Sequence, residues 1–349
     1  MTLVVQAAGM VTAVGLDAAS SCAAMRARID GFAETRFVGS DGNWMIGAAV
    51  PLPRNWIGQK RMVHLAAGAM VDILDSVPDL SQDDALILCL AERDRPGKPV
   101  IDIARFAEEL AHVTKTSSKI RTRIIENGRP SGFAALQQAE KLIAEGKANR
   151  VLVVGVDSYL TTRTISDYRS KKRIMMADNH NGFIPGEAAA AILVGKGKHG
   201  LRLSGLGLAR EEAFIYNQLE QDGLDRPLRA DGMVAAYRQA FEASKTQLGG
   251  IEYRISDLIG DKFFFQQAAL TTLRLERGRS EFQDLWSPAE SLGNVGAAVV
   301  PIMIGQALYA SQKGYSMGSP LLIEASGDEG ACAAAVFHET ERAVWRRAS

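Results

Sequence analysis

A short turn in the middle of the chain is built like a reactive site. Residues 129–132 read Arg-Pro-Ser-Gly and join a strand-like segment to a helix-like segment. At such an elbow, the first backbone N–H groups of the helix can hold an oxyanion beside a nucleophile. Ser131 is the only hydroxyl of the turn, and a serine nucleophile needs a base within hydrogen-bond reach. We therefore favour the simpler interpretation, in which Ser131 caps the helix N-terminus.

The cysteines and histidines form no recognisable metal or disulfide pattern. Cys22, Cys89 and Cys332 are far apart and odd in number, which favours a reduced, cytoplasmic protein. Cys89 lies in an apolar run and Cys332 in a glycine-rich turn, so both are interpreted as small core residues. No two cysteines have metal-ligand spacing and the five histidines are scattered. We expect no metal and no cofactor.

The composition indicates a large folded body without an electrostatic preference. The chain has 349 residues, 47% of them hydrophobic, with 40 basic and 40 acidic side chains. This length suggests two domains or two fused halves. Zero net charge gives no indication of binding to nucleic acid or to an anionic membrane. No uncharged apolar stretch reaches about 18 residues, so we expect no membrane-spanning segment.

Strand and helix signals alternate along the chain. Apolar runs of strand length between helices predict parallel strands that are covered on both faces. The pattern repeats after residue 198, so we expect one half over 1–198 and a second half over 199–349. The predicted strands are 3–9, 85–91, 121–125, 151–156, 188–194, 201–208, 255–259, 321–325 and 331–337. The predicted helices are 17–28, 61–74, 101–113, 131–145, 233–245, 264–275 and 295–310, with a polar loop ending near residue 181.

Four segments, in the right order, resemble the β-ketoacyl synthases and together cover about residues 4 to 338. They are VVQAAGMVTAVGLDAASSCAAMRARIDGF, PSGFAALQQAEKLIAEGKANRVLVVGVDS, NGFIPGEAAAAILV and SLGNVGAAVVPIMIGQAL. The resemblance implies an α/β protein with the thiolase fold, five α-β-α-β-α layers made of two duplicated βαβαβαββ halves. It also implies a dimer that forms across the strand at 121–125.

The resemblance places no nucleophile at the elbow. The family's reactive cysteine falls on Arg129 in one register and on Pro130 in the register of the initiating branch. Neither side chain can attack a thioester. Pro130 also lacks the backbone N–H that would complete an oxyanion hole.

The family's histidines are missing as well. Asp261 stands at the place of the first histidine, or Gln266 in the initiating-branch register, and Asn294 stands at the place of the second. Phe263 and Phe265 take the places of threonines that bind the pantetheine arm. The run from Phe263 to Phe265 could line a lipid channel, but we favour ordinary packing.

The site implied by the resemblance is a structural plug. A buried Arg129 needs a carboxylate, and we expect Asp261 to supply it, or otherwise Glu187. Phe183 and Glu187 come from the NGFIPGEA segment and support the site. An alternative is that Arg129 receives a phosphate or a carboxylate of a ligand. The glycine-rich turns SLGNVGAA and SGDEGACAA are interpreted as tight turns near the site.

The resulting functional hypothesis is a catalytically silent, β-ketoacyl synthase-like (3-oxoacyl-ACP synthase-like) protein that acts through protein–protein contacts. The resemblance suggests the chain-length partner of a heterodimeric synthase, or an accessory protein of bacterial type VI secretion. We expect a homodimer or a heterodimer with a related chain, and a protein client or acyl carrier protein as partner. The alternatives are an active acyl-transferring or condensing enzyme that uses an unmatched residue, and a non-catalytic acyl-thioester binder.

Overall fold

The structure, a computed structural model, describes residues 3–39, 42–53, 55–77, 80–116, 120–217, 226–276 and 283–340. Its main sheet contains β1 (Val4–Val11), β4 (Ala85–Leu90), β5 (Arg121–Glu126), β6 (Arg150–Ser158), β7 (Glu187–Gly195), β8 (Leu201–Arg210), β9 (Tyr253–Ser256), β10 (Asp284–Trp286), β11 (Leu321–Ser326) and β12 (Ala331–Glu339). A separate hairpin pairs β2 (Ala33–Val38) with β3 (Trp44–Gly47). The helices are α1 (Ala18–Arg26), α2 (Gly58–Leu74), α3 (Ile103–Thr114), α4 (Ser131–Ala144), α5 (Thr162–Ser170), α6 (Asp231–Ser244), α7 (Lys262–Leu275), α8 (Ala289–Leu292) and α9 (Val299–Lys313).

The strand order repeats, as the predicted duplication requires. The order across the sheet is β10-β9-β11-β12-β8-β1-β7-β6-β4-β5. Counting β1, β4, β5, β6 and β7 as strands 1 to 5, and β8 to β12 likewise, each half has the order 3-2-4-5-1. In both halves the fifth strand is antiparallel to its neighbours, and the others pair in parallel. The boundary predicted near residue 198 falls between β7 and β8 and remains a prediction.

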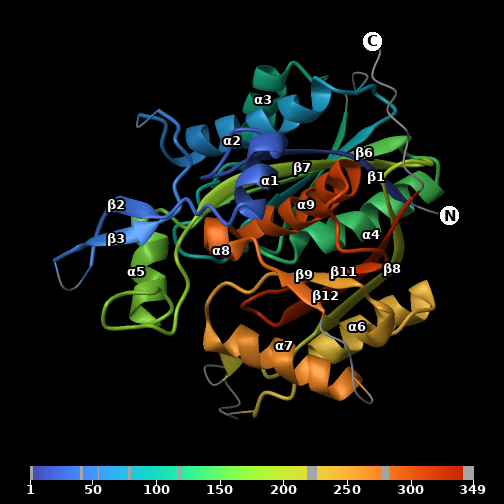
Figure 1. Cartoon of the computed structure of the whole chain (residues 1–349). Helices are drawn as coiled ribbons and strands as arrows, with labels where there is room; N and C mark the ends of the chain where they lie inside the picture. The colour runs from blue at the N-terminus through green and yellow to red at the C-terminus, as the bar shows by residue number, and fades with distance from the viewer. Residues whose placement is uncertain are drawn as a thin grey trace.

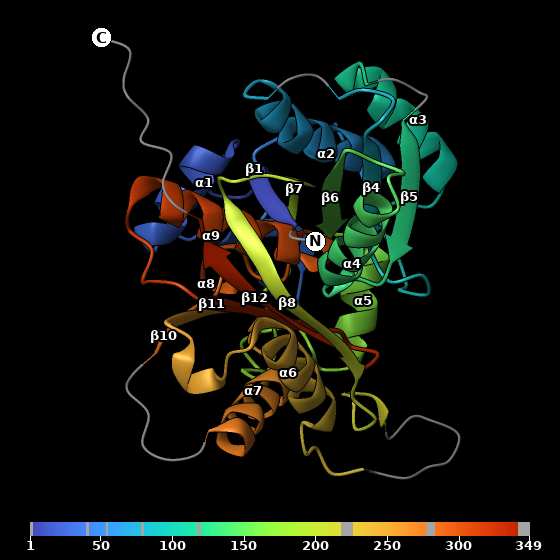
Figure 2. The ribbon, with the colours of Figure 1, turned by 90° about the vertical axis from the view of Figure 1, so that its right-hand side faces the viewer.

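The hydrophobic clusters define five layers. One cluster joins α1, α4 and α9 to the inner faces of strands from both halves, such as β6 and β11. A second packs α2 and α3 on the outer face of the first half, and a third packs α6 on the outer face of the second. Figure 1 shows α2 and α3 above, α9 and α4 in the middle, and α6 and α7 below. Figure 2 shows the same arrangement from the side, with β8 crossing between the halves.

The two central helices, α4 and α9, pack against each other. A Cβ atom added at Gly132 of α4 would lie 2.6 Å from the side chain of Val300 in α9. Helix α9 is buried almost all round, which fits a helix enclosed between two sheets. It begins later than predicted, because Gly296–Ala298 forms a separate 3-10 turn.

Several elements were not predicted from the sequence. Helix α5 lies in the segment interpreted as a polar loop, because few of its residues are buried and its polar composition hides the periodicity. Its N-cap is Thr161, whose hydroxyl accepts from the backbone N–H of Thr164 at 3.3 Å. The hairpin β2–β3, the short helix α8 and the short edge strand β10 were also missed. Within the described ranges, no helix is both long and apolar enough to cross a membrane.

Candidate functional site

The elbow follows β5 directly. Gly128 has a φ of 58°, a conformation that favours glycine, and Pro130 is the N-cap of α4. Ser131 is the first helical residue, and its hydroxyl donates to the carbonyl oxygen of Gly128. The prediction that Ser131 caps the helix is therefore wrong. Its hydroxyl bonds backward to the turn, which leaves it directed away from the helix N–H groups.

Arg129 is the first residue of the elbow, and its side chain is completely buried. Its Nη1 donates to Asp257 Oδ2 at 2.9 Å and its Nη2 donates to Asp328 Oδ1 at 3.1 Å. The guanidinium also lies over the ring of Phe264, 4.1 Å from the centroid. Burial and neutralisation by acids are confirmed, but the predicted partners Asp261 and Glu187 are wrong.

Asp261 and Glu187 are each held by another arginine. Arg173 donates to Asp261 Oδ2 from Nε at 3.0 Å and from Nη2 at 2.7 Å. Arg61 makes a salt bridge with Glu187, which also accepts from the hydroxyl of Ser158 at 3.1 Å. Both carboxylates thus already have a cationic partner. Arg129 pairs instead with aspartates from two loops of the second half.

We call Arg129, Arg173, Asp257, Asp261 and Asp328 the arginine–aspartate clamp. Asp328 is its centre, because it accepts from Arg129 and from both terminal nitrogens of Arg173, each of these two at 3.2 Å. The two arginines belong to the first half of the sheet and the three aspartates to the second half. The clamp therefore joins the halves by ion pairs at the place where the resemblance locates an acyl site.

The three aspartates of the clamp differ in the direction in which their pKa values are shifted. Burial raises the pKa of Asp257 to about 6, although Arg129 opposes the shift. Burial also raises the pKa of Asp261, with Arg173 opposing. For Asp328 the effect of burial is outweighed by Arg173 and Arg129, which hold the pKa of its carboxyl well below its usual range. Asp328 is thus the firmly ionised acid of the clamp.

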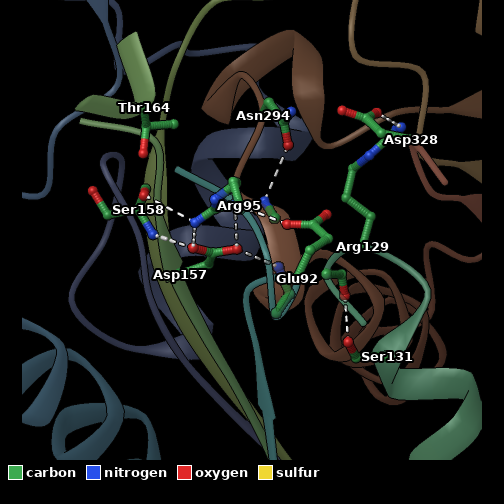
Figure 3. A network of polar contacts seen from close by, with 12 residues as sticks. Glu92, Arg95, Arg129, Ser131, Asp157, Ser158, Thr164, Asn294 and Asp328 are labelled. Atoms are coloured by element: carbon green, nitrogen blue, oxygen red, sulfur yellow. Dashed lines mark hydrogen bonds and ion pairs between the residues drawn. The ribbon is translucent and has the colours of Figure 1, made fainter. Parts of the chain in front are cut away.

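A second buried ion cluster lies beside the elbow (Figure 3). Arg95 makes a two-pronged contact with Asp157, and its Nη1 lies 3.3 Å from Glu92 Oε2. The guanidinium of Arg95 lies 4.2 Å from the centroid of the Tyr159 ring. Asp157 also accepts from the backbone N–H of Ala297 at 3.1 Å, which ties β6 to the turn before α9.

Two glycines let the backbone approach this second cluster. A Cβ at Gly128 would lie 1.8 Å from Glu92 Oε1, and a Cβ at Gly296 would lie 1.9 Å from Asp157 Oδ2. Both residues also have positive φ angles, 58° and 55°. Burial, with the charges of Asp157 and Asp328, raises the pKa of Glu92 to about 7, while Arg95 opposes this shift.

Several buried polar atoms around the elbow have no hydrogen-bond partner in the described part of the chain. Such atoms are uncommon in folded proteins and cluster at strained or functional places. They are Glu92 Oε1, Arg95 Nε, Arg129 Nε, Tyr159 Oη, Asp257 Oδ1 and Asn294 Nδ2. The site is consequently polar and buried, and several of its polar atoms could still make a hydrogen bond.

The remaining predicted positions divide between the buried site and the surface. Asn294 is buried, and its Oδ1 accepts from the backbone N–H of Gly296 at 3.1 Å. Phe183 is buried against Tyr159 and Tyr168. Pro130 packs near the turn that carries Asp328, because a Cβ at Gly327 would lie 3.3 Å from its Cδ.

The phenylalanine run does not pack as predicted. Phe264, the middle residue, is buried against Arg129, whereas Phe265 is 48% exposed. Phe263 and Gln266 line a surface cavity of about 590 Å³, whose other walls include Arg173 and Asp261. Ordinary packing is therefore the correct interpretation for Phe264 and the wrong one for Phe265.

All three cysteines are buried, which confirms the prediction that Cys89 and Cys332 are core residues. Burial, assisted by the negative charges of Asp72 and Asp17, raises the pKa of the Cys22 thiol to about 12. Burial also raises the thiol pKa values of Cys89 and Cys332. Thiols with such values are poor nucleophiles near neutral pH.

Sequence reasoning missed the acids that matter most. Asp257 follows the carboxyl end of β9, and Asp328 lies in the turn between β11 and β12. Ligand sites of α/β sheets gather at the carboxyl ends of parallel strands, so this placement was the available signal. The SGDEG turn was expected near the site, and it supplies Asp328.

This arrangement neutralises charge rather than presenting a nucleophile to a base. None of the residues in the clamp or in the second cluster is a cysteine or a histidine. The hydroxyl of Ser131 is engaged by a main-chain carbonyl. Arg129 fills the space beside the helix N-terminus with a guanidinium that two carboxylates hold.

Part of the sequence matches the sequence model of a known protein family. Residues 126–209 match the sequence model of the family described as 3-oxoacyl-[acyl-carrier-protein (ACP)] synthase III. No curated protein matches the sequence significantly.

Solved structures match over nearly the whole chain. The complex AntDE:AntF, a type II PKS acyl-carrier protein with its ketosynthase, gives a TM-score of 0.76 at 14% identity, with 97% of this chain and 99% of that chain covered. The ketosynthase ApeO with its chain length factor ApeC, from Xenorhabdus doucetiae, gives 0.75 at 12% identity, with 97% and 98% covered. The ishigamide ketosynthase/chain length factor gives 0.70 at 17% identity, with 97% and 100% covered. The fold is the thiolase-like fold of ketosynthases, as the resemblance implied.

Proposed function

We propose that this chain is a catalytically silent ketosynthase-like protein that works by pairing with other proteins. The observation that carries the proposal is the buried Arg129, held by Asp257 and Asp328 at the position where the resemblance expects a reactive cysteine. An arginine at this position cannot form an acyl-enzyme, and Pro130 removes one N–H from the oxyanion site.

The sheet offers an edge for such pairing. β5 is the last strand of the main sheet, and its outer edge has no partner strand in the described part of the chain. An open edge of this kind is a site for pairing with another chain. Solved relatives include complexes of a ketosynthase with its chain length factor. A chain-length-type partner in a heterodimer is therefore our leading candidate, and an accessory role in secretion is the second form of the same proposal.

Incubation with acetyl-CoA and with a long-chain acyl-CoA, followed by intact-mass spectrometry, tests the absence of catalysis. We expect no mass increase, under conditions in which an active ketosynthase is acylated. A stable adduct that maps to residues 129–131 would disprove the proposal. The Arg129→Cys variant is a further comparison: it places a thiol at the elbow without a base and beside two carboxylates, and we expect it to stay unacylated as well.

A second candidate, a non-catalytic acyl-thioester binder, rests on the cavity beside Phe263. This cavity of about 590 Å³ carries Lys171, Lys172 and Lys262 among its lining residues. Lysines can bind the phosphates of a carrier arm, and the ion-paired Arg173 and Asp261 also line this cavity. Calorimetric titration with an acyl-CoA distinguishes the two candidates, because saturable binding without acylation would favour the binder.

A further inference from the structure

Two neighbouring cavities lie between the hairpin β2–β3 and the rest of the molecule. Figure 1 shows the hairpin and α5 side by side at the left, although more than a hundred residues separate them in the sequence. One cavity measures about 730 Å³ and the other about 790 Å³. Both are lined by Arg36, Phe37 and Thr162, so they meet at these residues. We call the two together the hairpin groove.

The smaller cavity is positively charged. Its lining contains two arginines, three hydroxyl residues and no acid: Arg36, Phe37, Val38, Thr162, Ile165, Ser166, Arg169 and Ser170. Neither Arg36 nor Arg169 forms an ion pair with any residue that the structure describes, and both are exposed. Two unpaired guanidiniums facing a cavity without acids are complementary to an anionic ligand group.

The exposed face of the hairpin carries an apolar patch, with one acid, Glu34, directly across from Ile46. Val38 and Trp44 are direct cross-strand partners, and Ile46 follows on the same face. These side chains are 47%, 53% and 44% exposed, respectively. The larger cavity continues this apolar surface with Trp44, Leu52 and Trp56, and its acids are Glu34 and Glu187, the latter paired with Arg61. A two-stranded sheet gains little stability alone, so exposed apolar residues on it indicate a surface that a partner covers.

We propose that the hairpin groove binds an extended, acidic and apolar segment of a partner protein. Carboxylates of the segment pair with Arg36 and Arg169, and its apolar side chains fill the cavities on either side of Phe37. β2 has only β3 as a neighbour in the described sheets, so its other edge is free to pair with the backbone of the segment. A peptide fits better than a nucleic acid, because tryptophans and aliphatic side chains outnumber the two free arginines along the groove.

This groove is separate from the β5 edge, which closes the opposite end of the first half-sheet from β1. The inference goes beyond the proposed function and can fail independently of it. Loss of peptide binding would leave dimerisation through β5 intact, and loss of dimerisation would leave the groove intact.

Panning of a phage-displayed library of random strand-length peptides on the whole chain tests the inference. We expect the enriched peptides to combine Asp or Glu with aromatic or aliphatic residues. One enriched peptide, labelled with fluorescein, is then measured by anisotropy. The double variant Arg36→Glu/Arg169→Glu should weaken its binding at least about tenfold, and added salt should weaken binding to the wild type.

Arg163→Glu is the matched control, since Arg163 lies on the same helix but does not line the groove. It should leave the affinity unchanged, and Trp44→Ser should weaken binding without altering the circular dichroism spectrum. No enrichment, enrichment of basic peptides, or equal binding to the double variant and the wild type would overturn the proposal. A single-stranded oligonucleotide that binds with the same dependence on Arg36 and Arg169 would assign the groove to nucleic acid instead.

Discussion

Arg129 and Asp257 are 128 residues apart in the chain, in different halves of the sheet, and form a buried ion pair of 2.9 Å. Both side chains are almost completely inaccessible to water. Taking two charges out of water is costly, and the cost is offset only when each charge keeps its partner. The pair is therefore a point at which a single substitution should have a large effect.

Arg129→Ala should lower the free energy of unfolding by about 3 to 5 kcal/mol, because it leaves buried carboxylates without their cation. Urea unfolding followed by tryptophan fluorescence measures the change. The double variant Arg129→Ala/Asp257→Asn should recover part of the loss. Arg105→Ala, which removes the exposed partner of Glu109 on α3, is the control and should change stability little. Equal losses for Arg129→Ala and Arg105→Ala would contradict the plug.

Glu92 should make stability fall as the pH rises. The folded chain holds this proton up to a pKa of about 7, compared with an ordinary value of 4.5. The protonated form therefore stabilises the fold fully below pH 4.5, and this contribution is lost as the pH rises to about 7. The shift corresponds to about 3 kcal/mol. Asp257 acts in the same direction between its ordinary value of 3.8 and about 6.

Glu92→Gln should flatten this dependence, since the amide does not titrate. Unfolding in urea at about pH 5 and about pH 8 measures the two ends of the window. Glu108→Gln, a change on the exposed face of α3, serves as the control and should keep the wild-type slope. An unchanged slope in Glu92→Gln would show that Glu92 is ionised in the folded protein throughout this range.

Gly128→Ala should destabilise the fold more than Gly146→Ala. Both glycines have positive φ angles, 58° and 66°, so both variants carry the strain of this conformation, about 1 kcal/mol. At Gly128 the new methyl group would also lie 1.8 Å from Glu92 Oε1, whereas nothing lies within 4 Å at Gly146. The difference between the melting temperatures of the two variants measures the effect of the contact with Glu92. Equal melting temperatures would mean that Glu92 moves away without cost.

A cysteine in the middle of β5 should report on pairing at this edge. We expect Arg123→Cys or Thr122→Cys to form an intermolecular disulfide, visible on a non-reducing gel, because two antiparallel β5 strands would bring equivalent residues together. Leu285→Cys on β10, the other edge of the sheet, is the matched control and should form no intermolecular disulfide on the same gel. A monomer in light scattering, with no disulfide from either β5 variant, would argue against a homodimer. A heterodimer would then require co-expression with a related chain.

The sequence predicts the fold far better than the site. Runs such as ALILCL in β4 are buried along their whole length, so their apolar composition marks them clearly. The hairpin was missed because Trp44 and Ile46 face solvent, which spoils the usual alternation. Burial of Arg129 was predicted because the resemblance places this residue at the family's acyl site. The partners of Arg129 could not be predicted. Asp257 and Asp328 lie in loops far along the chain, and the sequence does not show which loops meet in the fold.

The clamp constrains which sequences this chain can reach by single steps. Replacing Arg129 by a cysteine would install a thiol but leave Asp257 and Asp328 facing each other without that cation. Their repulsion would raise the thiol pKa and lower stability together, so the intermediate would be both unreactive and fragile. Removing the aspartates first would instead leave the buried guanidinium of Arg129 without a carboxylate partner. A usable thiol at position 129 is therefore expected to need at least two coupled substitutions, one at Arg129 and one at its aspartates.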